Sequence, residues 1–173
     1  SLIITDLFTF SKHLAPILIE NNLCSVLNLG CEMMALNAEN AKVEIIRKIP
    51  TEPIYVQLDK DQFFQVLLNL ATNALHAMEE KPIDQRLLTV ALEKIDSKAV
   101  ILVQDTGSGI SKENLSKIFE PFFTTKKGSK GIGLGLSMCH GIIVQHKGEL
   151  QVESELGKGT TFRMLLPAKN SHS

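Results

Sequence analysis

The sequence has few cysteines, no long apolar run and no excess of charge of one sign. Its three cysteines, Cys24, Cys31 and Cys139, form no C-x-x-C pair, which favours a reducing compartment and argues against a zinc site. The longest uninterrupted apolar run spans residues 99–103, far short of the roughly 20 residues needed to cross a membrane. The 18 basic residues nearly balance the 19 acidic ones, so the composition argues against a general nucleic-acid or membrane-surface binder.

We expect no signal peptide at the start of this sequence, because residues 1–11 lack a basic segment ahead of their apolar residues. The first residue is Ser1 and not methionine, so we expect a piece of a longer protein that could carry a membrane segment upstream. A length of 173 residues predicts one compact domain, with or without an appended element.

Apolar spacing predicts helices over 2–12, 25–41 and 59–80, and from the glycine-rich residues 128–135 to about Lys147. Asp59 and Gln62 resemble a capping box at the start of the third helix. The apolar residues of the second helix share one face: Val26, Leu29, Met33 and Leu36.

Strands are predicted over 43–49, 54–58, 87–93 and 99–104, where apolar or β-branched residues lie between turn signals. A closing hairpin is predicted with strands near 150–154 and 162–166 and a turn at 157–159. In its second strand Phe162, Met164 and Leu166 alternate with other residues. Because helices and strands alternate without a regular βαβ rhythm, we expect an α/β sandwich on a mixed sheet.

Three polar side chains interrupt the apolar third helix on a single face: Asn69, Asn73 and His76 lie at i, i+4 and i+7. Asparagine is a mediocre helix former, and two buried amides need partners. Amide oxygens are neutral ligands suited to Mg²⁺, and a carboxylate in their place would repel a triphosphate. A polar groove edge satisfied by backbone or water is the alternative interpretation.

A carboxylate and two glycines follow the predicted strand 99–104. Asp105 at the strand end could accept a hydrogen bond from an exocyclic amine such as that of adenine. Gly107 and Gly109 allow unusual backbone angles and the close approach of a flat ligand. An ordinary Asp-x-Gly turn is the alternative.

Residues 121–135 contain three lysines and no acid, and their glycines lead into a helix. Lysines beside the N–H groups of a helix start can form a phosphate site, whereas a solvated loop is the alternative. The glycines at 131, 133 and 135 have G-x-G-x-G spacing, so this is neither a Rossmann fingerprint nor a P-loop.

In order and spacing these motifs resemble the ATP-binding domain of sensor histidine kinases, within the GHKL superfamily that includes gyrase-type and Hsp90-type ATPases. Residues 68–77 look like the family's N box, 105–110 like its first glycine box, 119–122 like its F box, 131–136 like its second glycine box and 157–162 like its closing strand pair. The resemblance covers about residues 14–167. It implies the Bergerat fold, a two-layer α/β sandwich with helices packed on one face of a mixed β-sheet.

The resemblance also implies a role for each motif. Residues 1–13 would end the dimerisation and phosphoacceptor helix, and 14–173 would form the catalytic ATP-binding domain. Asp105 would hold the adenine amino group with Gly109 and Thr161 nearby, Asn73 would coordinate Mg²⁺, and Asn69 and His76 would face the phosphates. Residues 112–130 would form a mobile lid over ATP, with 131–136 under the triphosphate. The full set of implied ATP-binding residues is Asn69, Asn73, His76, Ala77, Asp105, Gly107, Gly109, Ile110, Phe122, Thr124, Thr125, Lys126, Lys130, Gly131, Ile132, Gly133, Leu134, Gly135, Leu136 and Thr161.

The implied reaction is transfer of the γ-phosphate of ATP to a histidine on an upstream dimerisation domain, and from there to an aspartate of a response regulator. Gyrase-type relatives have a glutamate base four residues before the magnesium asparagine, whereas this chain has Asn69, which cannot take a proton from water. Family acceptor histidines are followed by an acid and then a proline. His13 comes nearest, with Pro16 after it, but Leu14 replaces the acid, so we expect the acceptor upstream of this chain.

The expected partners are the chain's own dimerisation domain and a response-regulator receiver domain, with no nucleic acid. We expect a monomeric fragment of a homodimeric parent, and a cytoplasmic domain whose parent could be an inner-membrane sensor. The alternative is a nucleotide-binding switch module of a mainly phosphatase or non-kinase GHKL protein. Asn69 disfavours a third class, a gyrase-like ATPase.

Overall fold

The computed structural model describes residues 15–121, 123 and 135–169. The helix predicted over 2–12 therefore lies outside the described residues. Within them, no helix is both long and apolar enough to cross a membrane.

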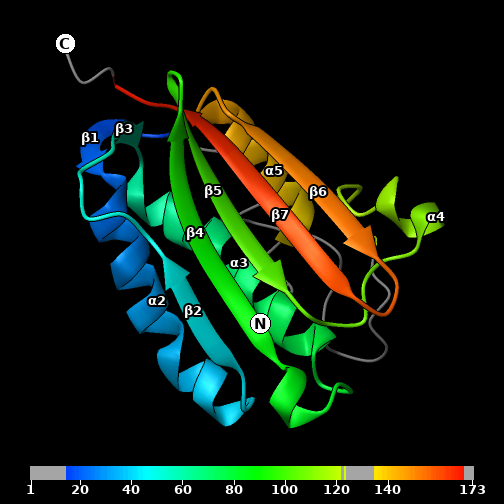
Figure 1. Cartoon of the computed structure of the whole chain (residues 1–173). Helices are drawn as coiled ribbons and strands as arrows, with labels where there is room; N and C mark the ends of the chain where they lie inside the picture. Colours follow the sequence, from blue (N-terminus) through cyan, green and yellow to red (C-terminus); the bar gives the residue numbers. More distant parts are fainter. Residues whose placement is uncertain (1–14, 122, 124–134, 170–173) are drawn as a thin grey trace, which may run out of the picture.

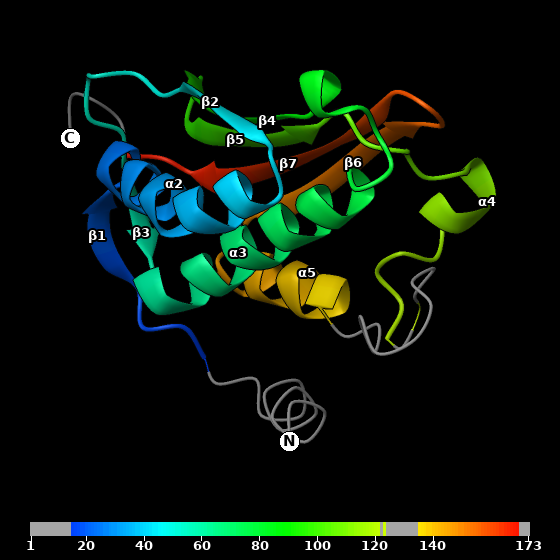
Figure 2. The ribbon, with the colours of Figure 1, turned by 90° about the horizontal axis from the view of Figure 1, so that it is seen from below.

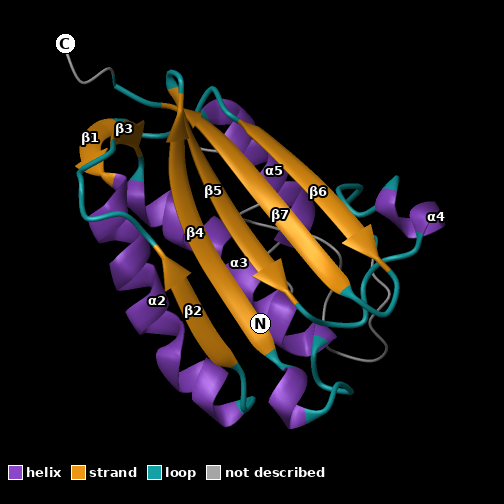
Figure 3. Ribbon diagram, viewed as in Figure 1, coloured by secondary structure: helices purple, strands orange, loops and turns teal. Residues whose placement is uncertain are grey.

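A five-stranded mixed sheet forms one layer of the domain (Figures 1 and 3). β2 pairs with β4 in parallel, and every other neighbouring pair is antiparallel. In spatial order its strands are β2 (Glu44–Lys48), β4 (Leu87–Ile95), β5 (Lys98–Asp105), β7 (Gly159–Pro167) and β6 (Glu149–Glu155). The predicted strands and the closing hairpin are confirmed.

Three helices form the second layer, all on one face of the sheet (Figure 2). They are α2 (Leu23–Asn40), α3 (Lys60–Ala77) and α5 (Gly135–Gln145). A 3₁₀ turn, η1 (Ile83–Gln85), and a short helix, α4 (Lys112–Leu115), lie in the connections. The structure thus confirms the predicted two-layer α/β sandwich on a mixed sheet.

Helix α3 begins where its capping signal predicts. The Asp59 carboxylate accepts the N–H of Gln62 at 3.1 Å, which satisfies one of the free donors of the first turn. The helix ends at Ala77 and not near Glu80, because the N–H groups of Met78 and Glu79 bond carbonyls three residues back, in a tightened last turn.

The apolar stripe predicted on α2 does not face the core as a unit. Val26 is buried, but Leu29, Met33 and Leu36 are 45%, 46% and 65% exposed. The buried face of α2 instead consists of Leu23, Cys24, Val26, Leu27, Gly30, Cys31, Met34 and Ala38. Its small residues let α2 lie close to α3, since a Cβ on Gly30 would overlap Leu67.

A separate two-stranded ribbon, which the sequence did not predict in full, lies at one end of the domain. Its β1 (Ile19–Asn22) pairs antiparallel with β3 (Tyr55–Leu58). The chain after β7 joins this ribbon, because the N–H of Lys169 donates to the carbonyl of Tyr55 at 2.9 Å and Lys169 forms a 3.1 Å ion pair with Glu20. β1 has only four residues and no alternation of apolar and polar side chains, so no periodic signal marks it.

Candidate nucleotide-binding site

Asp105 ends the central strand β5 as a nearly buried carboxylate, 6% exposed. Burial raises its pKa to about 6, although hydrogen bonds from the backbone N–H groups of Gly107 and Thr160 lower the pKa in part. The Gly107 N–H lies 2.8 Å from Oδ1. A partly desolvated carboxylate is a strong acceptor for a ligand N–H donor, because a charged group forms the stronger hydrogen bonds.

The turn after Asp105 packs tightly against the end of α3. A Cβ on Gly107 would lie 2.6 Å from the carbonyl oxygen of Ala77, and the N–H of Ser108 donates to that oxygen at 2.9 Å. Gly109 has φ of +77° and lies against the backbone of Glu155. Both glycines are therefore required by contacts inside the protein, in addition to any approach of a ligand.

Two hydroxyl groups that the sequence interpretation missed fix this turn to the β6–β7 hairpin. The Ser154 hydroxyl accepts the N–H of Ile110 at 2.7 Å, donates to the carbonyl of Gly159 at 2.9 Å, and lies 2.8 Å from the Thr160 hydroxyl. The result is a rigid wall beside Asp105.

The residue of β7 next to Asp105 is Thr160 and not Thr161. Asp105 pairs with Thr160, which is buried on the helix side of the sheet. Thr161 follows it, so its side chain lies on the opposite face. Thr160 continues the alternating series of Phe162, Met164 and Leu166, and all four residues are buried.

Helix α3 connects the Asp105 turn with the start of α5. Ala77 contacts the turn, as described above, and Asn69 lies beside Gly135, where a Cβ would come within 2.8 Å of the amide oxygen Oδ1. The amide nitrogen of Asn69 donates to the carbonyl of Gln65 at 2.9 Å. Asn73 lies between these two contact points on the same helix. Through Ala77 and Asn69, α3 thus contacts both the Asp105 turn and the first residue of α5.

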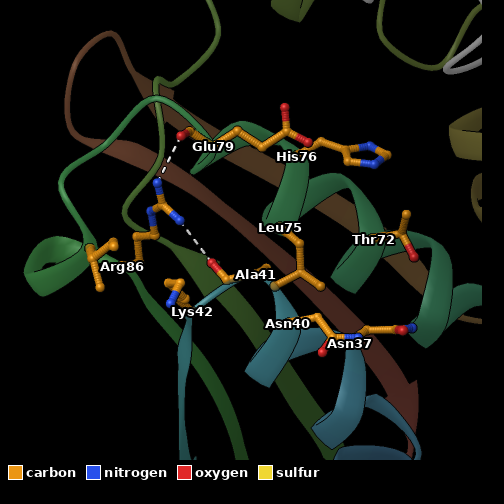
Figure 4. A pocket seen from close by; sticks show the side chains of 10 residues that line it. Asn37, Asn40, Ala41, Lys42, Thr72, Leu75, His76, Glu79 and Arg86 are labelled. Atoms are coloured by element: carbon orange, nitrogen blue, oxygen red, sulfur yellow. Dashed lines mark hydrogen bonds between the residues drawn. The ribbon is translucent and has the colours of Figure 1, made fainter.

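His76 also borders a cavity on the α2 side of α3. Its side chain lines a cavity of about 630 Å³ between the C-terminal ends of α2 and α3 (Figure 4). The other lining residues are Asn37, Asn40, Ala41, Lys42, Thr72, Leu75, Glu79, Ile83 and Arg86. The α3 surface with His76 therefore faces the C-terminal end of α2.

Arg86 borders this cavity and bonds carbonyl groups from two segments of the chain. Its guanidinium donates to the carbonyl groups of Ala41 and Glu79, each at 2.8 Å (Figure 4). It also donates to the carbonyl group of Lys81 at 2.9 Å. Ala41 is the C-cap residue of α2, and Glu79 and Lys81 lie in the turn that follows α3. Arg86 thus holds the two helix ends together.

Part of the predicted lid belongs to the described residues. Ser111 caps α4 by accepting the N–H of Asn114 at 3.2 Å. Ile118 is buried, and the ring of Phe119 stacks on His140 of α5 with centroids 5.3 Å apart. Several site residues predicted from the sequence lie outside the described residues, namely Phe122, Thr124, Thr125, Lys126, Lys130, Gly131, Ile132, Gly133 and Leu134. Gly135 and Leu136 form the first residues of α5.

The described residues contain no group of three or more histidine, cysteine or acidic side chains placed to hold a metal ion. The three cysteines lie in the core as free thiols, and burial raises the pKa of Cys139 to about 12. A divalent ion at this site would therefore need the amide oxygens of α3 together with oxygen atoms from a ligand.

Residues 58–170 match the family model described as histidine kinase-, DNA gyrase B-, and HSP90-like ATPase. Sporulation kinase C of Bacillus subtilis is 34% identical over 170 residues, which cover 98% of this chain and 38% of that protein. Sensor kinase CckA of Brucella abortus is 48% identical over 124 residues, covering 65% of this chain and 13% of that protein. The chain thus spans well under half the length of these relatives.

Solved structures show the same fold. A nucleotide-free catalytic domain of histidine kinase ThkA superposes with a TM-score of 0.75 at 30% identity, covering 87% of this chain and 95% of that one. ThkA in complex with response regulator protein TrrA superposes with a TM-score of 0.80 at 27% identity, covering 97% of this chain and 47% of that one.

Proposed function

This chain belongs to the histidine kinase-, DNA gyrase B- and HSP90-like ATPase family, as a catalytic ATP-binding domain of the sensor histidine kinase type, and we propose that it donates the γ-phosphate of Mg-ATP to a histidine on an upstream dimerisation domain. In this proposal residues 1–13 end the dimerisation helix, and 14–173 form the catalytic domain. The relatives that carry such domains are longer than this chain, which supports a parent with further domains.

The observation that carries the proposal is the buried Asp105 carboxylate beside a rigid glycine turn. Adenine presents an exocyclic amine as donor, and a carboxylate is the acceptor that such an amine prefers. Guanine presents a carbonyl oxygen at the same ring position, which would face the carboxylate without a proton between them. Asp105 therefore selects ATP over GTP, and Thr160 takes the neighbouring position first assigned to Thr161.

The phosphates are assigned to the α3 stripe and to the glycines before α5. We assign Asn73 to Mg²⁺, and Asn69, His76 and residues 131–136 to the phosphate region. The contact between Asn69 and Gly135 supports this grouping, because it joins the stripe to the helix that follows the glycines. Asn73 would hold Mg²⁺ there, and the ion would supply positive charge against the phosphate groups.

The chemistry of Asn69 favours transfer over hydrolysis. An amide cannot accept a proton from water, and phosphoryl transfer otherwise depends on an acceptor held in line with the γ-phosphate. The acceptor histidine is assigned to the upstream domain, and the subsequent receiver is a response regulator. The ThkA structure with its response regulator supports this second partner.

The test is incubation with radiolabelled Mg-ATP, with and without the parent's dimerisation domain on a separate chain. We expect label on the histidine of the added domain, at a rate limited by the missing covalent tether, and no stable label on the 173-residue chain alone. Stable label on this chain would overturn the acceptor assignment. Rapid phosphate release would favour a hydrolytic ATPase, and nucleotide binding without any transfer would favour a switch module of a mainly phosphatase parent.

A further inference from the structure

Three hydrogen bonds meet at Asp59, the residue before α3, and connect three parts of the chain. Its carboxylate oxygen Oδ1 accepts the N–H of Gln62 and caps α3. The other oxygen, Oδ2, accepts the N–H of Ile17 at 3.0 Å, in the segment 15–18 that leads into β1. The backbone N–H of Asp59 donates to Nε2 of His146 at 3.0 Å. We call Asp59, Ile17 and His146 the Asp59 joint.

His146 has one chemical form that fits these contacts. Because Nε2 accepts a hydrogen bond from Asp59, it carries no proton. The proton therefore lies on Nδ1, which is 2.8 Å from the carbonyl oxygen of Ile142. The ring is 3% exposed, so water has little access to replace either bond. A neutral imidazole thus ties the last turn of α5 to the start of α3.

The joint lies at the opposite end of α5 from the proposed phosphate region. α5 begins at Gly135 beside Asn69. Midway, the Cys139 thiol lies 3.8 Å from the carbonyl oxygen of Val66, and the Asp59 joint follows at the end. α5 therefore runs antiparallel to the first half of α3. Its 11 residues span about 16 Å, and a packed helix that shifts by 1–2 Å shifts at both ends.

We propose that the Asp59 joint couples the chain upstream of β1 to the nucleotide site. The Ile17 hydrogen bond holds α3 and α5 in the arrangement that binds Mg-ATP, and displacement of the upstream segment loosens it. Asp59 and His146 are positioning residues in this mechanism. The inference rests on the proposed function, since it assigns a regulatory input to the same site. Coupling is reciprocal, so bound ATP also strengthens the hold on Ile17.

Asp59→Asn can keep the hydrogen bond from Gln62 to the side chain while removing the one from Ile17. Asparagine caps helices as well as aspartate does, so its amide oxygen can keep the Gln62 N–H. Its NH₂ group then faces the N–H of Ile17, donor against donor. In calorimetric titration of the full chain with Mg-ATP, we expect affinity about fivefold weaker than wild type, at the lower end of typical couplings between sites.

Asp61→Asn is the matched control. Asp61 is exposed in the first turn of α3, so this variant removes the same charge from the same helix end without touching Ile17. It should bind Mg-ATP like the wild type. Equal weakening by both variants would assign the effect to charge at the helix terminus and would overturn the joint.

Ile17→Pro removes the same hydrogen bond from the other side, because proline has no N–H, and Ile17→Ala keeps it. Ile17→Pro should weaken Mg-ATP binding as Asp59→Asn does, and Ile17→Ala should not. The double variant should bind Mg-ATP no more weakly than whichever single variant has the lower affinity. The reason is that Asp59→Asn and Ile17→Pro remove the same hydrogen bond. Multiplicative losses, or unchanged affinity in every variant, would contradict the proposal.

Urea unfolding of each variant separates positioning from stability. A purely structural role would lower the unfolding midpoint and leave Mg-ATP affinity unchanged in native buffer, which would also contradict the proposal. Mg-ATP binding by the wild type distinguishes a failure of the proposed function from a failure of the Asp59 joint. If it does not bind Mg-ATP, the proposed function fails, whereas wild-type binding with unaffected variants contradicts the Asp59 joint alone.

Discussion

Asp105→Asn should make the nucleotide-free domain more stable at neutral pH while weakening its binding of ATP. The carboxylate is almost fully buried, and desolvation raises its pKa from 3.8 to about 6. Each pKa unit corresponds to about 1.36 kcal/mol, so the ionised group lowers folding stability by about 3 kcal/mol at pH 7.5. Asparagine removes this cost because it has no charge.

The gain in folding stability that Asp105→Asn brings is partly offset by a lost hydrogen bond. Oδ1 of the Asp105 carboxylate accepts the N–H of Gly107 at 2.8 Å, whereas in asparagine one of the two oxygens becomes an NH₂ group, which is a donor. Losing one such bond costs about 1–2 kcal/mol. The net expectation is a variant about 1–2 kcal/mol more stable than wild type at pH 7.5 without nucleotide.

The pH dependence gives the prediction its sharpest form. Between pH 3.8 and about 6 the folded wild type binds more protons at Asp105 than the unfolded chain does, so this group's contribution to stability falls as pH rises through that window. From pH 5 to pH 7.5 the variant's advantage over wild type should grow by about 1.4 kcal/mol.

Urea unfolding of both proteins at the two pH values measures this difference directly. A stability difference that does not change with pH would refute the assignment of a raised pKa to Asp105. The ATP affinity of the wild type should rise as the pH rises through about 6, because protonation of Asp105 below that pH removes the charged acceptor. At pH 7.5 the variant should bind ATP roughly 10- to 150-fold more weakly, the equivalent of about 1.5–3 kcal/mol.

Three further substitutions test other parts of the site. Asn73→Ala should abolish the Mg²⁺ dependence of nucleotide binding, seen by titration with and without EDTA, with a smaller effect on metal-free nucleotide; an unchanged Mg²⁺ dependence would place the metal elsewhere. Gly107→Ala should destabilise the fold by about 1–3 kcal/mol, because its Cβ would lie 2.6 Å from the Ala77 carbonyl oxygen; an unchanged urea midpoint would contradict the tight turn. Arg86→Met should cost about 2–3 kcal/mol through lost charged hydrogen bonds to helix-end carbonyls, and Arg86→Lys should recover only part because it lacks the planar fork.

Local signals predicted the parts of the fold that depend on neighbouring residues. The cap at Asp59 and the alternation of Phe162, Met164 and Leu166 require only nearby sequence, and both are confirmed. The face of α2 was misjudged because Leu29 and Leu36 have apolar spacing, while Gly30 decides which side approaches α3. Close helix approach is set by the smallest residues, which a hydrophobic pattern gives little weight.

The rest depends on contacts between residues far apart in the chain. His146 and Asp59 are 87 residues apart, and Ser154 meets Ile110 across 44 residues, so no local pattern links them. Thr160 is the one site residue of this kind that a local pattern indicates, because it continues the alternating series of Phe162, Met164 and Leu166. The family motifs located Asp105, Asn69 and the glycines, whereas the supporting hydroxyl groups and the Asp59 joint required the structure.

The most direct test of the central claim is a crystal structure of this chain with Mg²⁺ and a non-hydrolysable ATP analogue. The account predicts the exocyclic amine of adenine within about 2.7–3.2 Å of an Asp105 carboxylate oxygen, and the metal ion in contact with the Asn73 amide oxygen. An analogue seated with its adenine away from Asp105, for example in the cavity between α2 and α3, would contradict it.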